Sequence, residues 1–152
     1  MAMYKVQEES SIEVFTECLL LGQRHYEEVE DKSSRIPYNV NYDMMKVMAA
    51  HGLISVVTVR DSEGVLVGYM GNLVGEDFFT SQLEAKELGI YLKPEARGGR
   101  VFLKMIKLME KLMVDKGVVT QYLMFKEGHD AGFAERLGYV KTETVYQKLL
   151  EN

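Results

Sequence analysis

Two glycines and two arginines follow an apolar segment closely, and together they could bind an anion. The apolar segment covers residues 88–92, and residues 97–100 have the sequence Arg-Gly-Gly-Arg, where a helix-type pattern begins. Glycines let the backbone approach a phosphate closely, and the first N–H groups of a helix have no partner within the helix. The helix dipole favours negative charge at the same end. This stretch therefore predicts a phosphate-binding turn, with an ordinary strand-to-helix turn carrying surface arginines as the alternative.

Composition limits what such a turn could bind. The 152 residues carry 18 Lys and Arg against 23 Asp and Glu, which gives a net charge of −5. A protein that coats nucleic acid needs a basic surface, so we expect no nucleic-acid partner. No apolar run approaches the ~20 residues of a membrane span, and the first residues lack a signal-peptide pattern. A single cysteine and three scattered histidines predict neither a disulfide nor a metal site. We expect one cytoplasmic domain over residues 1–152.

The elements that position the turn follow from hydrophobic periodicity. Ser10 and Glu13 have the spacing of a capping box, which predicts the start of the first helix. Helices are also expected over 43–50, 98–116 and 130–137, with a loop over 27–42. Strands are expected over 3–8, 53–60, 65–74, 83–92, 118–125 and 142–149. This order predicts an α/β or α+β fold with a mixed sheet.

The turn resembles the coenzyme-A-binding motif of the GNAT superfamily of N-acetyltransferases, a strand followed by x-P-E-x-R-G-x-G-x-G and a long helix. Residues 133–139, Phe-Ala-Glu-Arg-Leu-Gly-Tyr, resemble a later signature of that family, L-Y-E-K-L-G-F. The element order is similar from residue 3 to about 149. With Phe78 and Phe79 ahead of the strand, the Arg-Gly-Gly-Arg variant resembles a branch with unassigned substrates. The resemblance implies a GNAT-like mixed, mainly antiparallel sheet of six to seven strands, flanked by about four helices.

The resemblance also implies an enzyme that moves an acetyl group from acetyl-CoA directly to a primary amine of a small molecule or protein. Gly89 would be a bulge that separates its strand from the one at 118–125. The pantetheine arm would pair with backbone groups of the strand, and the pyrophosphate would be bound by the turn and the helix start. Arg97 and Arg100 would add charge-assisted hydrogen bonds. The implied cofactor residues are Ile90, Tyr91, Leu92, Arg97, Gly98, Gly99, Arg100, Val101 and Phe102.

An amine must lose a proton before it attacks, because an alkyl ammonium has a pKa near ~10. Relatives often place a base on the strand that here carries Glu84 and Glu87. Strand alternation puts Glu87 on the face of Gly89 and Tyr91, unless a bulge changes the phase. We expect Glu87 to be this base, with Glu84 as the second candidate and a merely solvated carboxylate as the alternative to both. Tyr122, on the neighbouring strand, could bind substrate or donate a proton.

The sequence departs from the family pattern at two places. Ala134 occupies the position of the usual tyrosine proton donor, and Arg100 and Phe102 replace later glycines of the motif. A thiol with a pKa near ~8.5 is a fairly good leaving group, so acyl transfer need not be abolished. These departures keep a second interpretation open, a non-catalytic GNAT-like module that binds coenzyme A or a protein partner.

The acceptor pocket is expected from the most variable segments, which are residues 27–42, the second helix and residues 75–82. Tyr38 and Tyr42 could contact the acceptor. Carboxylates in the first segment would favour a cationic acceptor, although charged runs usually form a solvated surface. The partners expected are acetyl-CoA and an unidentified amine, with no metal, and the chain could form a homodimer.

Overall fold

The computed structural model describes residues 3–30, 36–126 and 132–150. The chain divides into two compact units, one covering Met1–Tyr122 and one covering Leu123–Asn152. Each unit is described by itself below, and the single domain over residues 1–152 stays a prediction.

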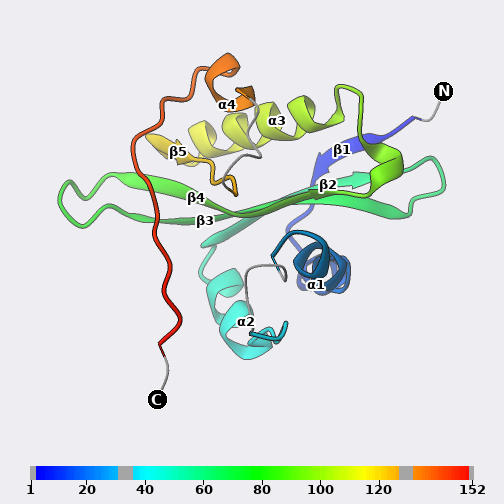
Figure 1. Ribbon diagram of the computed structural model, residues 1–152, viewed down its shortest axis with the longest axis horizontal. Helices are drawn as coiled ribbons and strands as arrows, with labels where there is room; N and C mark the ends of the chain where they lie inside the picture. The colour runs from blue at the N-terminus through cyan, green and yellow to red at the C-terminus, as the bar shows by residue number, and fades with distance from the viewer. Residues whose placement is uncertain (1–2, 31–35, 127–131, 151–152) are drawn as a thin grey trace. The chain divides into compact units, whose positions relative to one another are not determined.

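The larger unit contains a mixed sheet of five strands in the spatial order β1-β2-β3-β4-β5 (Figure 1). Neighbours from β1 to β4 pair antiparallel, whereas β5 pairs parallel to β4. A parallel pair needs a long crossover, and α3 (Val101–Asp115) lies in the connection between β4 and β5. The strands are β1 (Lys5–Glu8), β2 (Ile54–Arg60), β3 (Leu66–Glu76), β4 (Leu83–Leu92) and β5 (Thr120–Tyr122).

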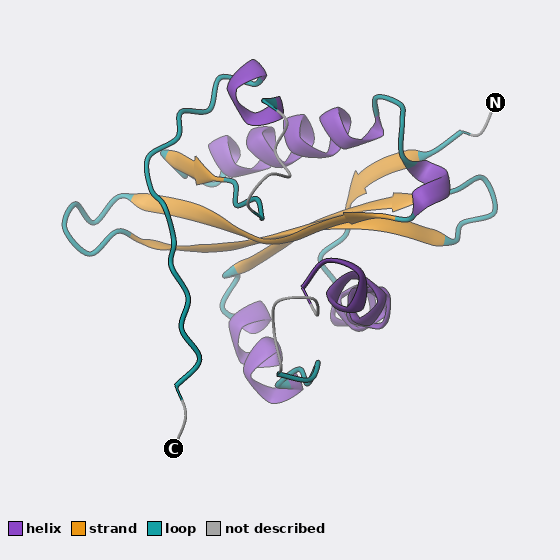
Figure 2. Cartoon of the chain, viewed as in Figure 1, coloured by secondary structure: helices purple, strands orange, loops and turns teal. Residues whose placement is uncertain are grey.

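Helices cover both faces of this sheet (Figure 2). On one face α3 contacts β1, β2 and β3. On the other face lie α1 (Ile12–His25) and α2 (Tyr42–Ala50). Phe15 and Cys18 of α1 form a buried cluster with Val56 and Leu66 of the sheet, and α2 packs against it. The buried residues of α3 are Met105, Ile106, Met109 and Met113.

Local signals explain where the helices begin and end. The side chain of Ser11 caps α1 by accepting a hydrogen bond from the Val14 N–H at 3.2 Å, so the cap lies one residue after the predicted Ser10. Gly52 follows α2 with a φ of 69°, a left-handed conformation that glycine adopts without strain. The predicted loop over 27–42 begins instead as a π-helix, η1 (Tyr26–Glu30), which continues α1 directly.

The prediction of six to seven strands is wrong for the described part of the chain, which has five. The strand β5 is shorter than the predicted 118–125, and residues 142–149, predicted as a strand, have no regular secondary structure. Strand-type residues need a neighbouring strand to pair with. The described residues of the smaller unit supply none, because their regular structure is the short helix α4 (Phe133–Arg136).

No helix among the described residues is long and apolar enough to span a membrane.

Candidate active site

The strands β4 and β5 run side by side and then separate. Whereas β4 pairs with β3 over its whole length, it pairs with β5 only from Glu84 to Lys86. The last pair joins Lys86 to Tyr122. Beyond this point, residues 88–92 have no strand on their outer edge within the described residues. This is the edge to which the family resemblance assigns the pantetheine arm.

A β-bulge lies where the strands separate. Gly71 pairs with Gly89, whereas the next residue, Asn72, pairs with Glu87. The extra residue is therefore Leu88, one position before the predicted bulge. Successive residues of β3 point to opposite faces of the sheet, so Glu87 lies on the face of Asn72, and Gly89 lies on the face of Gly71. The prediction from strand alternation that Glu87 lies on the same face as Gly89 is wrong, because the bulge shifts the alternation of side chains by one residue.

The face that carries Glu87 is the one covered by α3. Asn72 is fully buried and exchanges two hydrogen bonds with the Gln121 side chain, at 2.7 and 3.1 Å. Ser55 pairs with Asn72 and accepts a hydrogen bond at 2.6 Å from the ammonium of Lys116, which follows α3. Glu87 is itself only 8% exposed. A carboxylate in this layer is therefore largely shielded from solvent.

Backbone directions decide which residues of β4 can bind a ligand at its open edge. The N–H of Lys93 donates to the carbonyl of Val67 at 2.8 Å, so it points toward β3. Backbone groups alternate between the two edges along a strand. The backbone of Tyr91 therefore also faces β3, whereas Ile90 and Leu92 face the open edge. Two of the three predicted residues thus have the orientation that an added strand requires.

The turn after β4 leads directly into α3. A short 3₁₀ helix, η2 (Pro94–Ala96), is followed by Gly98, whose φ of 93° favours glycine. A Cβ atom added to Gly99 would meet no atom within 4 Å. Arg100 is the N-cap residue of α3, and its side chain makes no capping hydrogen bond. The first turn of α3, all of which lies within the described residues, holds no acidic residue. The positive end of the helix dipole is therefore not compensated by a carboxylate of that turn.

Arg97 links this turn to η1. Its Nε donates to the carbonyl of Leu92 at 2.7 Å, and its Nη2 donates to Oε1 of Glu28 at 2.9 Å. The hydroxyl of Tyr91 donates to the other oxygen of Glu28 at 2.6 Å. The hydrogen bonds from Tyr91 and Arg97 lower the pKa of the Glu28 carboxyl. The guanidinium that was predicted to bind phosphate therefore already contacts a carboxylate of the chain.

His25, the last residue of α1, lies against the bulge. Its Nδ1 is 2.6 Å from the hydroxyl of Tyr69, and its ring stacks on Tyr91 with centroids 5.1 Å apart. A Cβ atom on Gly89 would be 3.3 Å from Cε1 of His25, so glycine makes room for the imidazole. The sequence did not predict this packing of His25, because its histidines were considered only as metal ligands. The available signals for this contact were the position of His25 at the end of the first helix and the glycine at position 89 inside a strand.

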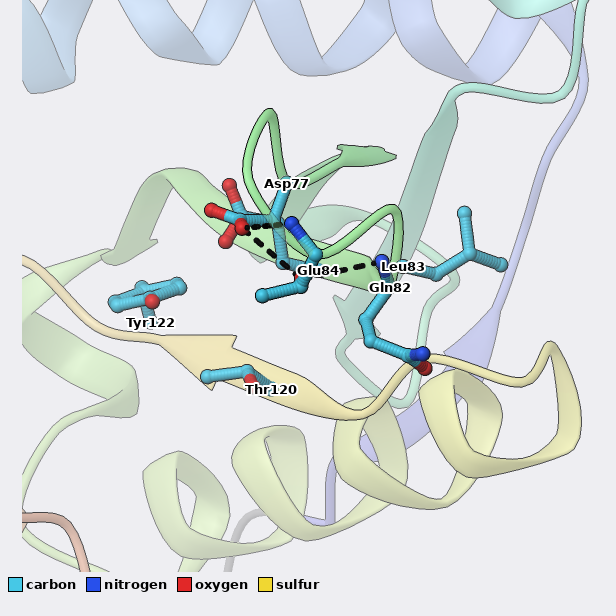
Figure 3. A pocket seen from close by; sticks show the side chains of 7 residues that line it. Asp77, Gln82, Leu83, Glu84, Thr120 and Tyr122 are labelled. Atoms are coloured by element: carbon cyan, nitrogen blue, oxygen red, sulfur yellow. Dashed lines mark hydrogen bonds between the residues drawn. The ribbon is translucent and has the colours of Figure 1, made fainter.

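Tyr122 and Glu84 line a pocket of about 200 Å³ at the start of β4, beside the loop that joins β3 to β4 (Figure 3). The ammonium of Lys86 lies 5.8 Å from the Tyr122 ring centroid. The other lining residues are Asp77, Thr80, Gln82, Leu83 and Thr120. The predicted Tyr38 and Tyr42 do not line this pocket. Tyr38 donates to the Leu19 carbonyl at 2.6 Å, and Tyr42 begins α2.

Among the residues that the structure describes, no cluster of His, Cys, Asp and Glu side chains could hold a metal ion. Ala134 lies in α4, where its carbonyl accepts hydrogen bonds from the N–H groups of Leu137 and Tyr139. The Ala134 position thus contributes backbone contacts within the smaller unit and no ionisable side chain.

Neither a protein-family model nor a curated protein matches the sequence. Solved structures do match, over nearly the whole chain. An aminoglycoside acetyltransferase from an uncultured soil metagenomic sample, in complex with sisomicin, is 12% identical with a TM-score of 0.75, and the match covers 98% of this chain and 96% of that one. The ribosomal-protein-alanine N-acetyltransferase from Brucella melitensis biovar Abortus 2308 is 13% identical with a TM-score of 0.73, covering 99% of each chain.

An aminoglycoside N-acetyltransferase in complex with CoA is also 13% identical, with a TM-score of 0.73, and the match covers 100% of this chain and 97% of that one. At such identities the likeness concerns the fold. The mainly antiparallel mixed sheet, the crossover through α3 and these matches agree with the predicted GNAT-like fold, although the sheet has five strands rather than six to seven. The chain therefore has the fold of the GNAT acetyltransferases.

Proposed function

We propose that the chain is an acetyl-CoA-dependent N-acyltransferase that moves an acetyl group directly to a primary amine. The observation that carries this proposal is the separation of β4 from β5, followed at once by the glycine turn and the start of α3. One continuous stretch thus offers a strand edge for a linear chain of amides and a helix end for phosphates. Acetyl-CoA contains both groups, and a neighbour of the same fold is a complex with CoA.

Acetyl-CoA would lie along β4 with its phosphates at α3. The pantetheine amides would pair with Ile90 and Leu92 at the open edge. The pyrophosphate would accept hydrogen bonds from the turn and the first turn of α3, which comprise Gly98, Gly99, Arg100, Val101 and Phe102. Arg100 would add its charge, whereas Arg97 would first have to exchange its contact with Glu28.

The reaction forms a C–N bond and breaks the C–S bond of the thioester. Tyr122 ends the paired part of β5, and Glu87 directly follows the last paired residue of β4. Both thus flank the point where the strands separate. Tyr122 would protonate the departing thiolate in place of the tyrosine that Ala134 replaces. Glu87 is the carboxylate that the sequence offers as a base, and it would act from the α3 face of the sheet.

The acceptor would enter beside Tyr122. The pocket there holds the carboxylates of Asp77, which accepts hydrogen bonds from Thr80, and of Glu84, which lies 3.7 Å from the ammonium of Lys86. A cationic amine would compete with Lys86 for the charge of Glu84. The structural neighbours include aminoglycoside acetyltransferases and a ribosomal-protein-alanine N-acetyltransferase. Sisomicin and a peptide that begins with alanine are therefore the first acceptors to test.

Calorimetric titration with acetyl-CoA and with desulfo-CoA, followed by a thiol-release assay with both acceptors, tests the proposal. Binding together with amide formation would support it. Binding without transfer to either amine or to water would favour the non-catalytic CoA-binding module. Absence of binding would refute the role assigned to the turn and leave a protein-interaction module.

A further inference from the structure

We infer that the chain acetylates its own Lys86, so that this side chain is a modification site of the protein. The inference rests on the proposed function, because it needs acetyl-CoA at the open edge of β4. It names an acceptor amine that belongs to the chain itself. It therefore predicts an acyl transfer that takes place without any second substrate.

The position of the thioester follows from the path that the open edge of β4 leaves for acetyl-CoA. With the pyrophosphate at α3, the pantetheine arm would run past Leu92 and then Ile90. It would stop before Lys86, because Lys86 pairs with Tyr122 and the edge is closed from there backward. The thioester would accordingly lie beside the bulge at Leu88, whose side chain is exposed.

The side chain of Lys86 lies on the same side of β4 as this path. Its backbone pairs with Leu73 of β3 on one side and with Tyr122 of β5 on the other. The ammonium is 5.8 Å from the centroid of the Tyr122 ring, so the side chain leans toward β5. Two residues of a strand span about 7 Å, which separates Lys86 from Leu88 along β4. The flexible four-carbon stem of a lysine can cover most of this distance.

The present contacts of Lys86 allow its ammonium to move toward the thioester. Its side chain is 57% exposed. The ammonium lies 3.7 Å from Oε1 of Glu84, which is longer than a direct hydrogen bond. An ion pair with so exposed a partner is weak, because water screens it. The nitrogen can therefore leave Glu84 without a large loss of free energy.

The sequence of β4 leaves one lysine for this role. Lys86 is the lysine of the strand, whereas the next one along the chain, Lys93, directly follows Leu92. Lys93 thus lies at the end of the open edge that is assigned to the phosphates. Of the two amines, Lys86 is the one at the sulfur end.

The protons and electrons of the transfer balance as follows. The Lys86 ammonium first loses one proton to Glu84 or to water. The Nζ lone pair attacks the thioester carbon, the C–N bond forms, and the C–S electron pair leaves with sulfur. The nitrogen gives up a second proton, and the thiolate takes one through Tyr122 or water, which gives coenzyme A. The product is an uncharged amide, so each chain reacts once and Glu84 loses its contact with the ammonium.

The test incubates the unchanged protein with acetyl-CoA at pH 8, without any added amine. Intact mass spectrometry counts the acetyl groups, and peptide mapping locates them. Lys46 of α2 and Lys111 of α3 are exposed and report direct chemical acetylation in the same sample. Lys86 should react faster than either by about tenfold or more, because a bound thioester is held beside this one amine.

Variants and a competitor show whether the reaction occurs at the proposed site. Lys86→Arg keeps the positive charge and should lose the fast acetylation, whereas the matched control Lys46→Arg should keep it. Desulfo-CoA should slow the reaction as it displaces acetyl-CoA. The first-order rate should stay constant over a tenfold range of protein concentration, because the amine and the thioester are bound to the same chain. Mapping of the unchanged protein decides if Lys86→Arg does not fold.

Equal acetylation of Lys86, Lys46 and Lys111, or a rate that rises with protein concentration, would overturn the inference. If the protein acetylates an added amine but not Lys86, the inference fails and the acyltransferase proposal stands. If it binds acetyl-CoA and no amine reacts, the enzyme and the modification are both refuted. If it does not bind acetyl-CoA, the proposed function is refuted at its first step and the inference with it.

Discussion

Replacing Arg60 by methionine should destabilise the larger unit, because this guanidinium joins three of its elements. Arg60 ends β2, and its Nε donates to Glu9, which follows β1, at 2.9 Å. Its other two nitrogens donate to both oxygens of Glu17 in α1, at 2.9 and 2.8 Å. Methionine keeps an apolar stem of similar length in the same place. The substitution therefore removes chiefly the charge and its hydrogen bonds.

The two ion pairs contribute unequally. The Arg60 and Glu9 side chains are 17% and 22% exposed, and the Thr58 hydroxyl also donates to Glu9. A shielded hydrogen bond to a charged group contributes about 1.5–3 kcal/mol. The Glu17 side chain is 41% exposed, so screening by water limits its pair to about 0.5 kcal/mol. We expect the free energy of unfolding to fall by about 2–3 kcal/mol.

The loss should depend on pH. Burial alone would raise the pKa of Glu9, but hydrogen bonds from Thr58 and Arg60 outweigh it and lower the pKa in the folded protein. The hydrogen bond from Arg60 likewise lowers the pKa of Glu17. A carboxyl with a lowered folded pKa stabilises the protein above its unfolded pKa of ~4.3, and this contribution is lost as pH falls through the folded pKa. The difference between the two proteins should therefore shrink below about pH 4.

Urea unfolding at pH 7 and at pH 3.5, followed by circular dichroism, measures both effects. Arg136→Met, at an exposed arginine of the smaller unit, is the matched control and should change the free energy by less than about 0.5 kcal/mol. A midpoint at pH 7 that is the same in Arg60→Met and the unchanged protein would refute the assignment. An undiminished difference at pH 3.5 would show that packing, rather than the ion pairs, carries the effect.

Three shorter predictions concern the site and the core. Gly99→Asp should weaken acetyl-CoA binding at least tenfold by calorimetry, because it adds negative charge beside the proposed phosphate site. Gly75→Asp, also in open space, should not weaken it. Gly89→Ala should lower kcat without changing the Kd for desulfo-CoA, because its methyl group displaces His25. Gly71→Ala, whose methyl group makes an ordinary contact with Leu88, is the control. Equal kcat values for the two variants would contradict the prediction. Burial raises the pKa of the Cys18 thiol to about 12, so iodoacetamide should label it at pH 8 only after unfolding; labelling of the folded protein would be the contrary result.

Local sequence signals predicted the elements that depend on short-range patterns. The β2–β3 hairpin, the bounds of β4 and the amphipathic helix α3 all follow from periodicity and turn residues. The segment at 142–149 has an equally strand-like composition, yet it has no regular structure. A strand depends on a partner that composition cannot identify, whereas a helix makes its hydrogen bonds within its own segment. This explains why the helices were predicted more reliably than the last strands.

In the candidate site, too, one feature depends on strand pairing and could not be predicted from the sequence. The glycines predicted the turn, because they are visible in the sequence, whereas the open edge of β4 was implied by the family resemblance. The side on which Glu87 lies depends on Leu88, the single extra residue that sets Asn72 opposite Glu87. Nothing in the composition of residues 83–92 specifies this register, since it arises from pairing with a different strand.

The same extra residue determines which ionisable groups lie on each face of the sheet beside Gly89. Without it, Glu87 would share the face of Gly89, and the carboxylate would compete with His25 for the space that the glycine leaves. With it, Glu87 lies opposite Asn72 and is 8% exposed, and the imidazole of His25 lies beside Gly89, Tyr69 and Tyr91. Counting along the strand therefore assigns Glu87 to a different face of the sheet from the one that the observed register gives. The face on which Glu87 lies depends on a register that only the folded sheet defines.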